Sequence, residues 1–499
     1  MVGGKQKNKK NWYKNHSIFG RYLATTILLP EPYNLSGVLL ASNTGIDALA
    51  QTLTVGDTYL ISSSIVNSFR FTMNRSYTAR SEANCCSLAS LGSKMYDYGQ
   101  LSSIIAVSGG FTIGGNTQSN GKTNVDNFGF NDDISWVKGA HQLGFGASAS
   151  FAKMDYLGNS YDRGQLSFNG GTTGLCLADF LTGNVFSFIQ GPANYQDGRQ
   201  RTFGLYVQDT WKVLPRLTVN LGLRWEPYLP LQRADGAVSH FDFASFMNGT
   251  RTSQFTKAPP GLFYPGDPGF PENSGTYRVW NNFSPRIGLA WDPMGDGKMS
   301  VRAAFGMFYD FQNMLYFNNT SLIPPWTPRI ELRNVSLDDP WKTYPGGNPF
   351  PLAFNKDAPF PLASVYPNMR YDTKNPSVRS WNLSIQRQIG TQWVVSATYL
   401  GNQSIHIWAS QNINPAIFIP GASTTANTEA RRFLTLQNPT YGPYFAKMIY
   451  ADDGGTASYE GLLLTAERRF NKNLSFNANY TWSHCISDPY MQNLAGEIG

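Results

Sequence analysis

The stretch RTFGLYVQDTWKVLPRLTVNLGLRWEPYLP, residues 201–230, decides how this chain folds. Apolar and polar residues alternate in two runs of this stretch, and only Val213, Leu214 and Pro215 separate the runs. A period of two is typical of extended strands with one apolar and one polar face, and the short connection predicts a hairpin. The apolar face then has to meet either a protein core or lipid. That face carries Phe203, Leu205, Val207, Trp211, Leu217, Val219, Leu221, Leu223 and Trp225.

The composition favours lipid. Charged residues make up 15% of the 499 residues, against roughly 25% in typical globular proteins, and aromatic residues reach 14%. The mean hydropathy is nevertheless −0.31, and no stretch approaches the ~20 consecutive apolar residues of a membrane helix. This combination is typical of an outer-membrane barrel, in which only alternate strand residues face lipid.

The same hairpin recurs along the chain, and long connections separate its copies. Further hairpins are predicted at residues 133–151, 284–310, 378–402 and 458–483, with a weaker pair at 51–61 and 67–75. The connections at 227–283, 311–377 and 401–457 are rich in Pro, Gly, Asn and Tyr. Alternating short and long connections predict an all-β fold, an antiparallel up-and-down transmembrane β-barrel with short periplasmic turns and long extracellular loops. A soluble β-sandwich would explain the alternation of residues but not the asymmetry of the loops.

Aromatic residues near the strand ends support this interpretation. Trp and Tyr are enriched where a membrane protein crosses the lipid–water interface. We therefore predict an interfacial aromatic girdle that includes Trp225, Trp291, Trp381, Trp393, Tyr480 and Trp482.

Charged residues also occur within or at the ends of the predicted strands. A charge that faces lipid near the bilayer midplane costs about 2–4 kcal/mol, so we expect most of these residues to face the lumen or to lie at the interfaces. Two interpretations stay open: they bind a plug and couple its motion to transport, or they pair with neighbouring strands. Loop aromatics such as Trp326, Trp341 and Tyr344 similarly suit either substrate contact or loop packing. The strand charges are Asp209, Arg224, Glu226, Arg302, Arg387, Glu467 and Arg468.

No group of residues suggests an enzyme. The five histidines are far apart in sequence, and we predict no catalytic residue, no cofactor and no metal site. Lysines in the polar, basic lead-in at residues 1–15 would suit nucleic acid, but no basic helix or nucleic-acid motif accompanies them, so we expect none to bind. Four cysteines are too few for a disulfide scaffold, although an oxidising compartment would allow a bridge from Cys85 or Cys86 to Cys176.

At the level of motifs, the hairpin resembles the barrel signature of TonB-dependent outer-membrane receptors. In that signature a Tyr-x-Gln-Asp strand turns into a Leu-x-Leu-x-Gly-Leu-Arg strand. The blocks HSIFGRYL, DISWVKGAHQLGFG, LADFLTGN, WNLSIQRQIG and SYEGLLLTAERRF follow in the order seen in the Oar-like branch of acidobacterial type. The likeness runs from about residue 11 to the C-terminal end. The signature residues here are Tyr206, Gln208, Asp209, Trp211, Leu221, Gly222 and Arg224.

The resemblance implies a larger protein than this chain. Family members carry a signal peptide, a carboxypeptidase-like domain and a plug ahead of the barrel, and none of these is recognisable here. We therefore expect residues 1–499 to be a fragment, a partial barrel with about 13 of roughly 22 strands.

The function implied is energised transport of a bulky substrate across the cell outer membrane. The implied partners are outer-membrane lipid and lipopolysaccharide, a plug domain, TonB and a substrate of unknown identity. A non-transporting, adhesive surface barrel and a non-functional receptor fragment are the alternatives.

Overall fold

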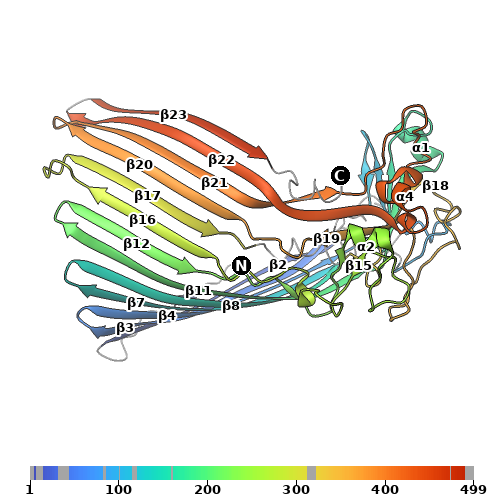
Figure 1. Cartoon of the computed structure of the whole chain (residues 1–499), viewed down its shortest axis with the longest axis horizontal. Coiled ribbons are helices and arrows are strands. Elements are labelled where there is room, and N and C mark those ends of the chain that lie inside the picture. The colour runs from blue at the N-terminus through green and yellow to red at the C-terminus, as the bar shows by residue number, and fades with distance from the viewer. Residues whose placement is uncertain are drawn as a thin grey trace.

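A long antiparallel ladder forms the main body of the protein in this computed structural model (Figure 1). The structure describes residues 5–6, 15–31, 44–82, 86–99, 102–114, 121–158, 161–311, 322–471 and 474–488. Each strand of the ladder pairs with the next one in chain order, and β1 (Lys5–Gln6) pairs with the free edge of β2. The ladder consists of β2 (His16–Leu29), β3 (Gly45–Ser62), β4 (Ile65–Ser81), β7 (Lys122–Lys138), β8 (His141–Gly158), β11 (Asn194–Leu214), β12 (Leu217–Trp225), β16 (Phe283–Trp291), β17 (Met299–Tyr309), β20 (Ser377–Ile389), β21 (Trp393–Asn412), β22 (Phe445–Asn471) and β23 (Leu474–Asp488).

The hairpin predicted from residues 201–230 is formed by β11 and β12. Tyr206 lies opposite Arg224, and Leu214 lies opposite Leu217. The turn therefore consists of Pro215 and Arg216, slightly later than the sequence predicts. On its other edge β11 pairs with β8 over a long register, which explains why β11 begins before the alternating run does.

Short and long connections leave the ladder at opposite ends. The tight turns lie together at one end of the sheet, and the long connections gather at the other end (Figure 1). Two long connections, residues 82–121 and 159–193, add to the three predicted ones. The two halves of the predicted hairpin at 133–151 are likewise the ends of the much longer strands β7 and β8.

The long connections fold into a cap whose strands join the sheet of the ladder through β22. In this sheet β5 (Ile104–Val107) pairs with β6 (Thr112–Ile113) and lies parallel to β9 (Gln165–Phe168), which pairs with β10 (Asn184–Gln190). The sheet continues through β18 (Ile330–Ser336) and β19 (Ser364–Met369) to the first part of β22. The 27-residue strand β22 thus connects the cap to the ladder. The remaining elements are β13 (Gln232–Arg233), β14 (His240–Phe241), β15 (Leu262–Phe263), α1 (Cys176–Leu181), α2 (Phe243–Asn248), α4 (Phe433–Gln437), η2 (Glu272–Ser274), η4 (Glu429–Arg431) and η5 (Gly442–Tyr444).

Two buried hydrophobic clusters lie in the cap, at the end where β22 begins. The first includes Phe246, Tyr264, Tyr366 and Phe445, and the second includes Phe168, Phe188 and Trp341. Loops this long need internal packing to order their backbone. The cap is therefore a folded unit, which the sequence did not predict.

The ladder is open across the described residues. No pairing there joins β23 to β1 or β2, so closure into a complete barrel and the fraction of 22 strands stay predictions. No helix among the described residues is long and apolar enough to cross a membrane.

The bridge considered between Cys85 or Cys86 and Cys176 is not formed. Cys176 and Cys485 are free thiols, whereas Cys86 is disulfide-bonded. Cys85 and most of the basic lead-in lie outside the described residues.

Candidate functional site: the inner face of the sheet and the cap

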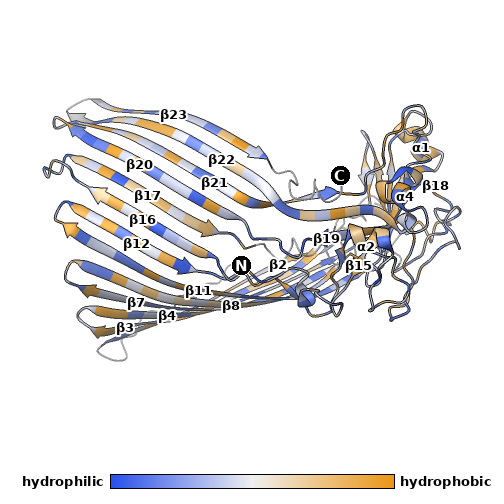
Figure 2. Ribbon diagram, viewed as in Figure 1, coloured by the Kyte–Doolittle hydropathy of each residue, from blue (hydrophilic) through white to orange (hydrophobic). Residues whose placement is uncertain are grey.

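The ladder has one apolar face, and its side chains are exposed. Hydrophilic and hydrophobic residues alternate along the strands (Figure 2). The exposed fraction is 52% for Leu205 and 54% for Ile287, unusual values for aliphatic side chains in the middle of a sheet. The same face carries Phe145, Phe203, Val207, Leu223, Leu289, Phe305, Leu383, Ile385, Tyr399 and Leu464.

Hydroxyl, amide and glycine residues occupy the opposite face, which we call the inner face. Cross-strand hydrogen bonds connect Thr210 Oγ1 to Asn220 Oδ1 at 2.8 Å and the hydroxyls of Ser384 and Thr398 at 2.8 Å. In an outer-membrane barrel the apolar face meets lipid and the polar face lines the interior. The outer face is therefore suited to lipid and the inner face to water or to a polar partner.

Four of the seven predicted signature residues lie on the inner face. Tyr206 donates from its hydroxyl to Asp133 on β7 at 2.7 Å. Arg224 donates to Ser148 on β8 at 3.0 Å and forms an ion pair with Glu226 at 2.6 Å. Gln208 and Gly222 face each other across the hairpin. These contacts connect β7, β8, β11 and β12 into one wall.

The other three, Asp209, Trp211 and Leu221, lie on the outer face. Asp209 contacts His141 Nδ1 at 2.7 Å, and the His141 ring stacks on Trp211 with 5.3 Å between ring centroids. The sequence Asp-Thr followed by an aromatic residue recurs in β3 and gives the same arrangement. There His16 contacts Asp57 at 2.8 Å and stacks on Tyr59. Both triplets lie beside tight turns, where a polar pair on the outer face can reach the interface.

The remaining strand charges divide between the two faces. Arg302 and Glu467 share the inner face with Arg224, whereas Arg387 and Arg468 lie on the outer face near the turns. Arg468 lies over the ring of Trp393 at 5.7 Å and donates to Gln392. Such a position allows a long side chain to reach water from the edge of the lipid.

The predicted girdle residues fall at both ends of the outer face. Trp291 and Trp393 lie beside the tight turns, and Trp225 and Trp381 lie towards the cap. Tyr480 and Trp482 on β23 are 61% and 59% exposed. Their contact with a lipid interface stays a prediction.

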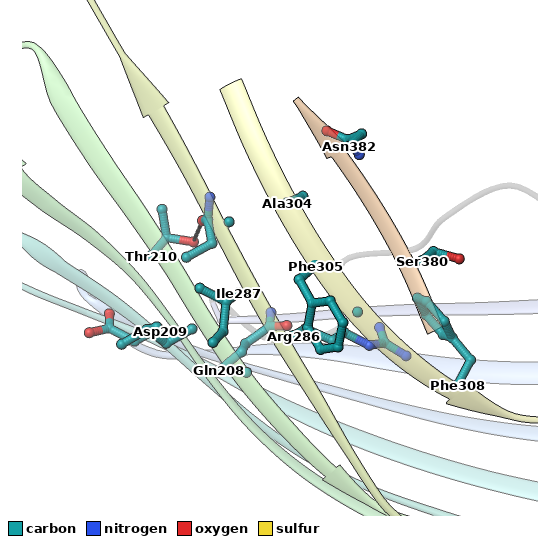
Figure 3. Close-up of a pocket in the computed structure, with 15 residues that line it drawn as sticks. Gln208, Asp209, Thr210, Arg286, Ile287, Ala304, Phe305, Phe308, Ser380 and Asn382 are labelled. Atoms are coloured by element: carbon teal, nitrogen blue, oxygen red, sulfur yellow. Dashed lines mark hydrogen bonds between the residues drawn. The ribbon is translucent and has the colours of Figure 1, made fainter. Parts of the chain in front are cut away.

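A hollow of about 440 Å³ opens along β11, β12, β16, β17 and β20 (Figure 3). Its inner-face side chains include Gln208, Asn220, Arg286, Phe308 and Asn382. Gly222 and Gly306 lie directly opposite Arg286 on the two neighbouring strands, so neither of these two positions carries a side chain. Arg286 was not among the predicted site residues. The sequence could have indicated it only through the alternation of β16, which places Arg286 among the polar, inward-facing residues.

The cap contains a second hollow, of about 520 Å³, between β14, the residues after β19, and β22. The ring of His240 stacks on Tyr371 with 3.9 Å between centroids, and Tyr277 lies on the same wall. Arg370 and Asp372 form an ion pair at 3.0 Å beside these rings. Burial lowers the pKa of His240, so the imidazole is neutral at neutral pH.

The loop aromatics that the sequence singled out lie inside the cap. Trp341 is 1% exposed and Tyr344 is 9% exposed, and both belong to the second cluster. Trp326 packs against the first cluster and donates from Nε1 to the carbonyl oxygen of Asp235 at 3.1 Å. The structure therefore supports loop packing for these three residues.

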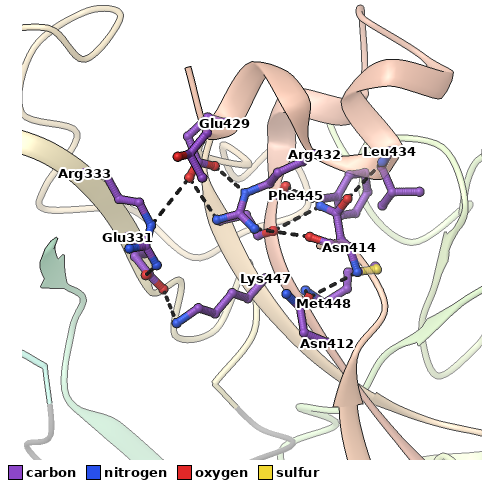
Figure 4. A network of polar contacts seen from close by, with 12 residues as sticks. Glu331, Arg333, Asn412, Asn414, Glu429, Arg432, Leu434, Phe445, Lys447 and Met448 are labelled. Carbon is purple, nitrogen blue, oxygen red and sulfur yellow. Dashed lines mark hydrogen bonds and ion pairs between the residues drawn. The ribbon is translucent and has the colours of Figure 1, made fainter. Parts of the chain in front are cut away.

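A polar network fixes the C-terminal loop of the cap (Figure 4). Glu331 on β18 accepts from Arg333 at 2.6 Å and forms an ion pair with Lys447 on β22 at 3.0 Å. Arg432 pairs with Glu429 at 2.5 Å and donates to the carbonyl oxygen of Asn414. Arg333 lies 3.9 Å from Glu429, and Asn414 donates to the carbonyl oxygen of Phe445 at 2.8 Å, so the network connects the 413–444 loop to β18 and β22.

Comparison with known proteins identifies the family of the chain. A family model described as "Outer membrane beta barrel domain" matches residues 7–499. No curated protein matches the chain. Similar solved structures include the outer-membrane transporter YddB from Escherichia coli, with 11% identity, a TM-score of 0.47, and coverage of 96% of this chain and 47% of that one.

Two further solved structures have similar identity and coverage. A mutant of the ferric enterobactin receptor PfeA from Pseudomonas aeruginosa has 12% identity, a TM-score of 0.47, and coverage of 95% and 50%. A double mutant of the Serratia marcescens hemophore receptor HasR, in complex with HasA and heme, has 10% identity, a TM-score of 0.46, and coverage of 96% and 53%. The chain thus spans about half the length of these solved structures. By the family match, which covers nearly its whole length, the chain belongs to the outer-membrane β-barrel domain family, and its location is the cell outer membrane.

Proposed function

We propose that this chain is barrel sequence of a TonB-dependent outer-membrane receptor, of the Oar-like branch, and that it takes part in energised transport of a bulky substrate. The observation that carries the proposal is a continuous polar inner face that runs from the tight turns to a folded cap and leaves a hollow unfilled by its own side chains. Small barrels fill their interior with side chains, whereas large ones enclose a channel or a plug.

The signature residues support the same proposal. Tyr206, Gln208, Gly222 and Arg224 form part of one wall on the inner face, and their contacts reach Asp133 and Ser148 on neighbouring strands. A wall fixed in this way gives a lumen-filling domain a rigid surface to move against. The partners under this proposal are a plug domain, TonB, the transported substrate and lipopolysaccharide.

The free edge of β23 supports a larger barrel. In lipid, each backbone group that lacks a partner costs several kcal/mol. Among the described residues, β23 pairs only with β22, so its other edge needs a further strand in the membrane. We propose that these strands form part of a barrel that further strands complete.

The cap would supply the capture step. Its hollow presents the rings of Tyr277 and Tyr371 beside the ion pair of Arg370 with Asp372. Pockets of this size, with apolar walls and a few charged groups, are typical of ligand sites. Substrate would bind in the cap and then pass along the inner face.

Nutrient uptake tests the proposal. The source bacterium is compared with a strain lacking this gene and a strain lacking TonB, and the removal of defined oligomeric nutrients from the medium is measured. We expect one nutrient class that neither mutant strain takes up. Unchanged uptake in the strain lacking the gene would contradict the proposal, and a loss of surface attachment alone would favour an adhesive barrel instead.

A further inference from the structure

We propose, building on the function proposed above, that the hollow on the inner face is a binding site for a carboxylate and that Arg286 is the residue that holds it. Arg286 projects from β16 in the middle of the inner face (Figure 3). It is exposed, and the register places Gly222 on one side and Gly306 on the other. The ring of Phe308 occupies the space beside Gly306, so a ligand can approach the guanidinium from the side of Gly222.

Phe308 holds the guanidinium in place. The Arg286 guanidinium carbon lies 4.8 Å from the centroid of the Phe308 ring, a cation–π contact. A Cβ added at Gly306 would come within 3.0 Å of the Phe308 ring and 3.9 Å of Arg286 Cγ. Glycine at 306 thus leaves room for the ring that supports Arg286, and the supported side chain loses less freedom when a ligand binds.

Arg286 has no acidic partner among the described residues. The one carboxylate in the lining belongs to Asp209, and it is already bound to His141 on the outer face. Arg224, two residues from Gly222 on the inner face, shows the contrast: it has both Glu226 and Ser148. Arg286 makes only the contact with Phe308 across the part of the chain that the structure describes.

The chemistry of the hollow favours a carboxylate over a phosphate. A guanidinium presents paired N–H donors that match a carboxylate in a bidentate arrangement. One guanidinium neutralises one carboxylate, whereas a phosphate monoester would bring about −1.5 to −2 charges against a single cation. The amides of Gln208 and Asn382 and the hydroxyl of Ser380 line the same hollow and can donate to a second oxygen.

The carboxylate has two sources in a receptor lumen. It belongs either to an acidic side chain of a protein segment inside the barrel or to a carboxylated solute on its way through. Both present the same group to Arg286, so the experiment uses one probe for each.

The test measures binding to the full chain, folded in detergent micelles. Fluorescence anisotropy follows a labelled hexaglutamate peptide, with hexaglutamine as the neutral control and free glutarate as competitor. We expect hexaglutamate to bind and Arg286→Gln to weaken its binding about tenfold, the effect of losing one charged hydrogen bond. Arg286→Lys should retain part of the affinity, because lysine keeps the positive charge but lacks the paired N–H donors of the guanidinium. Arg387→Gln, which removes an outer-face arginine, should change nothing.

Competition by glutarate at millimolar concentration would assign the site to carboxylated solutes, and binding of the peptide alone would assign it to a protein side chain. Equal binding of hexaglutamine, or unchanged affinity in Arg286→Gln with retained β-sheet circular dichroism, would overturn the inference. If uptake depends on the gene but the peptide does not bind, only the carboxylate site is ruled out. If the peptide binds through Arg286 but uptake is unchanged in the strain lacking the gene, only the transport proposal is ruled out.

Discussion

Trp341 shows how much of the cap depends on single residues. Its ring packs edge-on against Phe188, Tyr344 and Phe350, with 5.3, 5.3 and 5.6 Å between centroids. The sequence offered substrate contact or loop packing for this residue, since an aromatic residue in a polar loop has no period to place it. Only the pairing of β10 with β18 brings its neighbours together.

We expect Trp341→Ala to loosen the cap by about 3–5 kcal/mol, because it removes a fully buried aromatic side chain and leaves a cavity. Phe418→Ala, at a side chain that is 75% exposed, serves as the matched control and should change stability by less than about 0.5 kcal/mol. Amide hydrogen exchange in β9, β10 and β18 is the measurement. Equal exchange in the two variants would contradict the assignment of Trp341 to the core of the cap.

Asp162 gives the cap a pH dependence of unusual sign. Burial raises the pKa of its carboxyl to about 6, although its own backbone and that of Arg163 donate to it. Below that pKa the folded cap binds a proton that the unfolded chain, with a pKa near 4, does not bind. This carboxyl therefore makes the cap more stable as the pH falls from about 6 to about 4.

Asp162→Asn should remove this contribution. Thermal unfolding of both proteins between pH 4 and pH 7 gives the difference, and the comparison cancels other titrating groups such as His240. We expect the stability advantage of the variant over the wild type to shrink as the pH falls through 6. A difference that is independent of pH would show that Asp162 does not titrate in this range.

Among the elements, the strands follow from the sequence better than their lengths do. The period of two fixes which residues share a face, and the structure confirms hairpins at all the predicted positions. Strand ends were missed where the alternation fades, as in the first part of β11. There the backbone pairs with β8 and β13. These strands are distant in sequence, so the local pattern of residues could not predict the pairing.

A charge introduced on the outer face of a strand should affect stability differently from one introduced on the inner face. Leu383 and Asn382 are consecutive in β20, and Leu383 is 44% exposed on the outer face. Leu383→Arg should cost about 2–4 kcal/mol and reduce the folded protein in the outer membrane, whereas Asn382→Arg should be tolerated. Heat-modifiable mobility of membrane fractions on gels reports the folded population. Equal loss in both variants would mean that the faces are assigned wrongly.

The network around Glu331 predicts a local effect within the cap. Glu331 is 2% exposed and balances Arg333 and Lys447, so Glu331→Gln would leave two cations without their shared acid. Removing one partner of a buried ion pair costs about 3–5 kcal/mol, and the partial exposure of Lys447 reduces that figure. We expect limited proteolysis to cut the 413–444 loop of the variant first. Cleavage at the wild-type rate would show that hydrophobic packing alone holds this loop.

The site follows from the sequence only in part. Tyr206, Gln208, Gly222 and Arg224 were predicted because they belong to a recognisable hairpin, and the structure places them on the inner face; their role stays a prediction. Arg286 was not predicted, because an arginine at the start of an alternating run carries no signal of what stands beside it. Its setting depends on the register of β16 with two other strands, which places glycines on both sides.

The lengths of the connections indicate how the molecule is oriented in the outer membrane. The tight turns lie at one end of the sheet and the folded cap at the other (Figure 1). Loops of this length lie outside the cell in outer-membrane barrels, and short turns lie in the periplasm. We therefore propose that the cap faces the exterior and that the inner face of the sheet leads from it towards the periplasm.

Epitope insertion tests this orientation. One tag is placed beside Gly421 in the cap, and another beside Gly297 in the turn between β16 and β17, two positions where an added Cβ meets no neighbour. Flow cytometry then compares antibody binding to intact and permeabilised cells. We predict that intact cells bind antibody to the cap tag, and that the turn tag is reached only after permeabilisation. Labelling of the turn tag on intact cells, or of neither tag before permeabilisation, would contradict the claim.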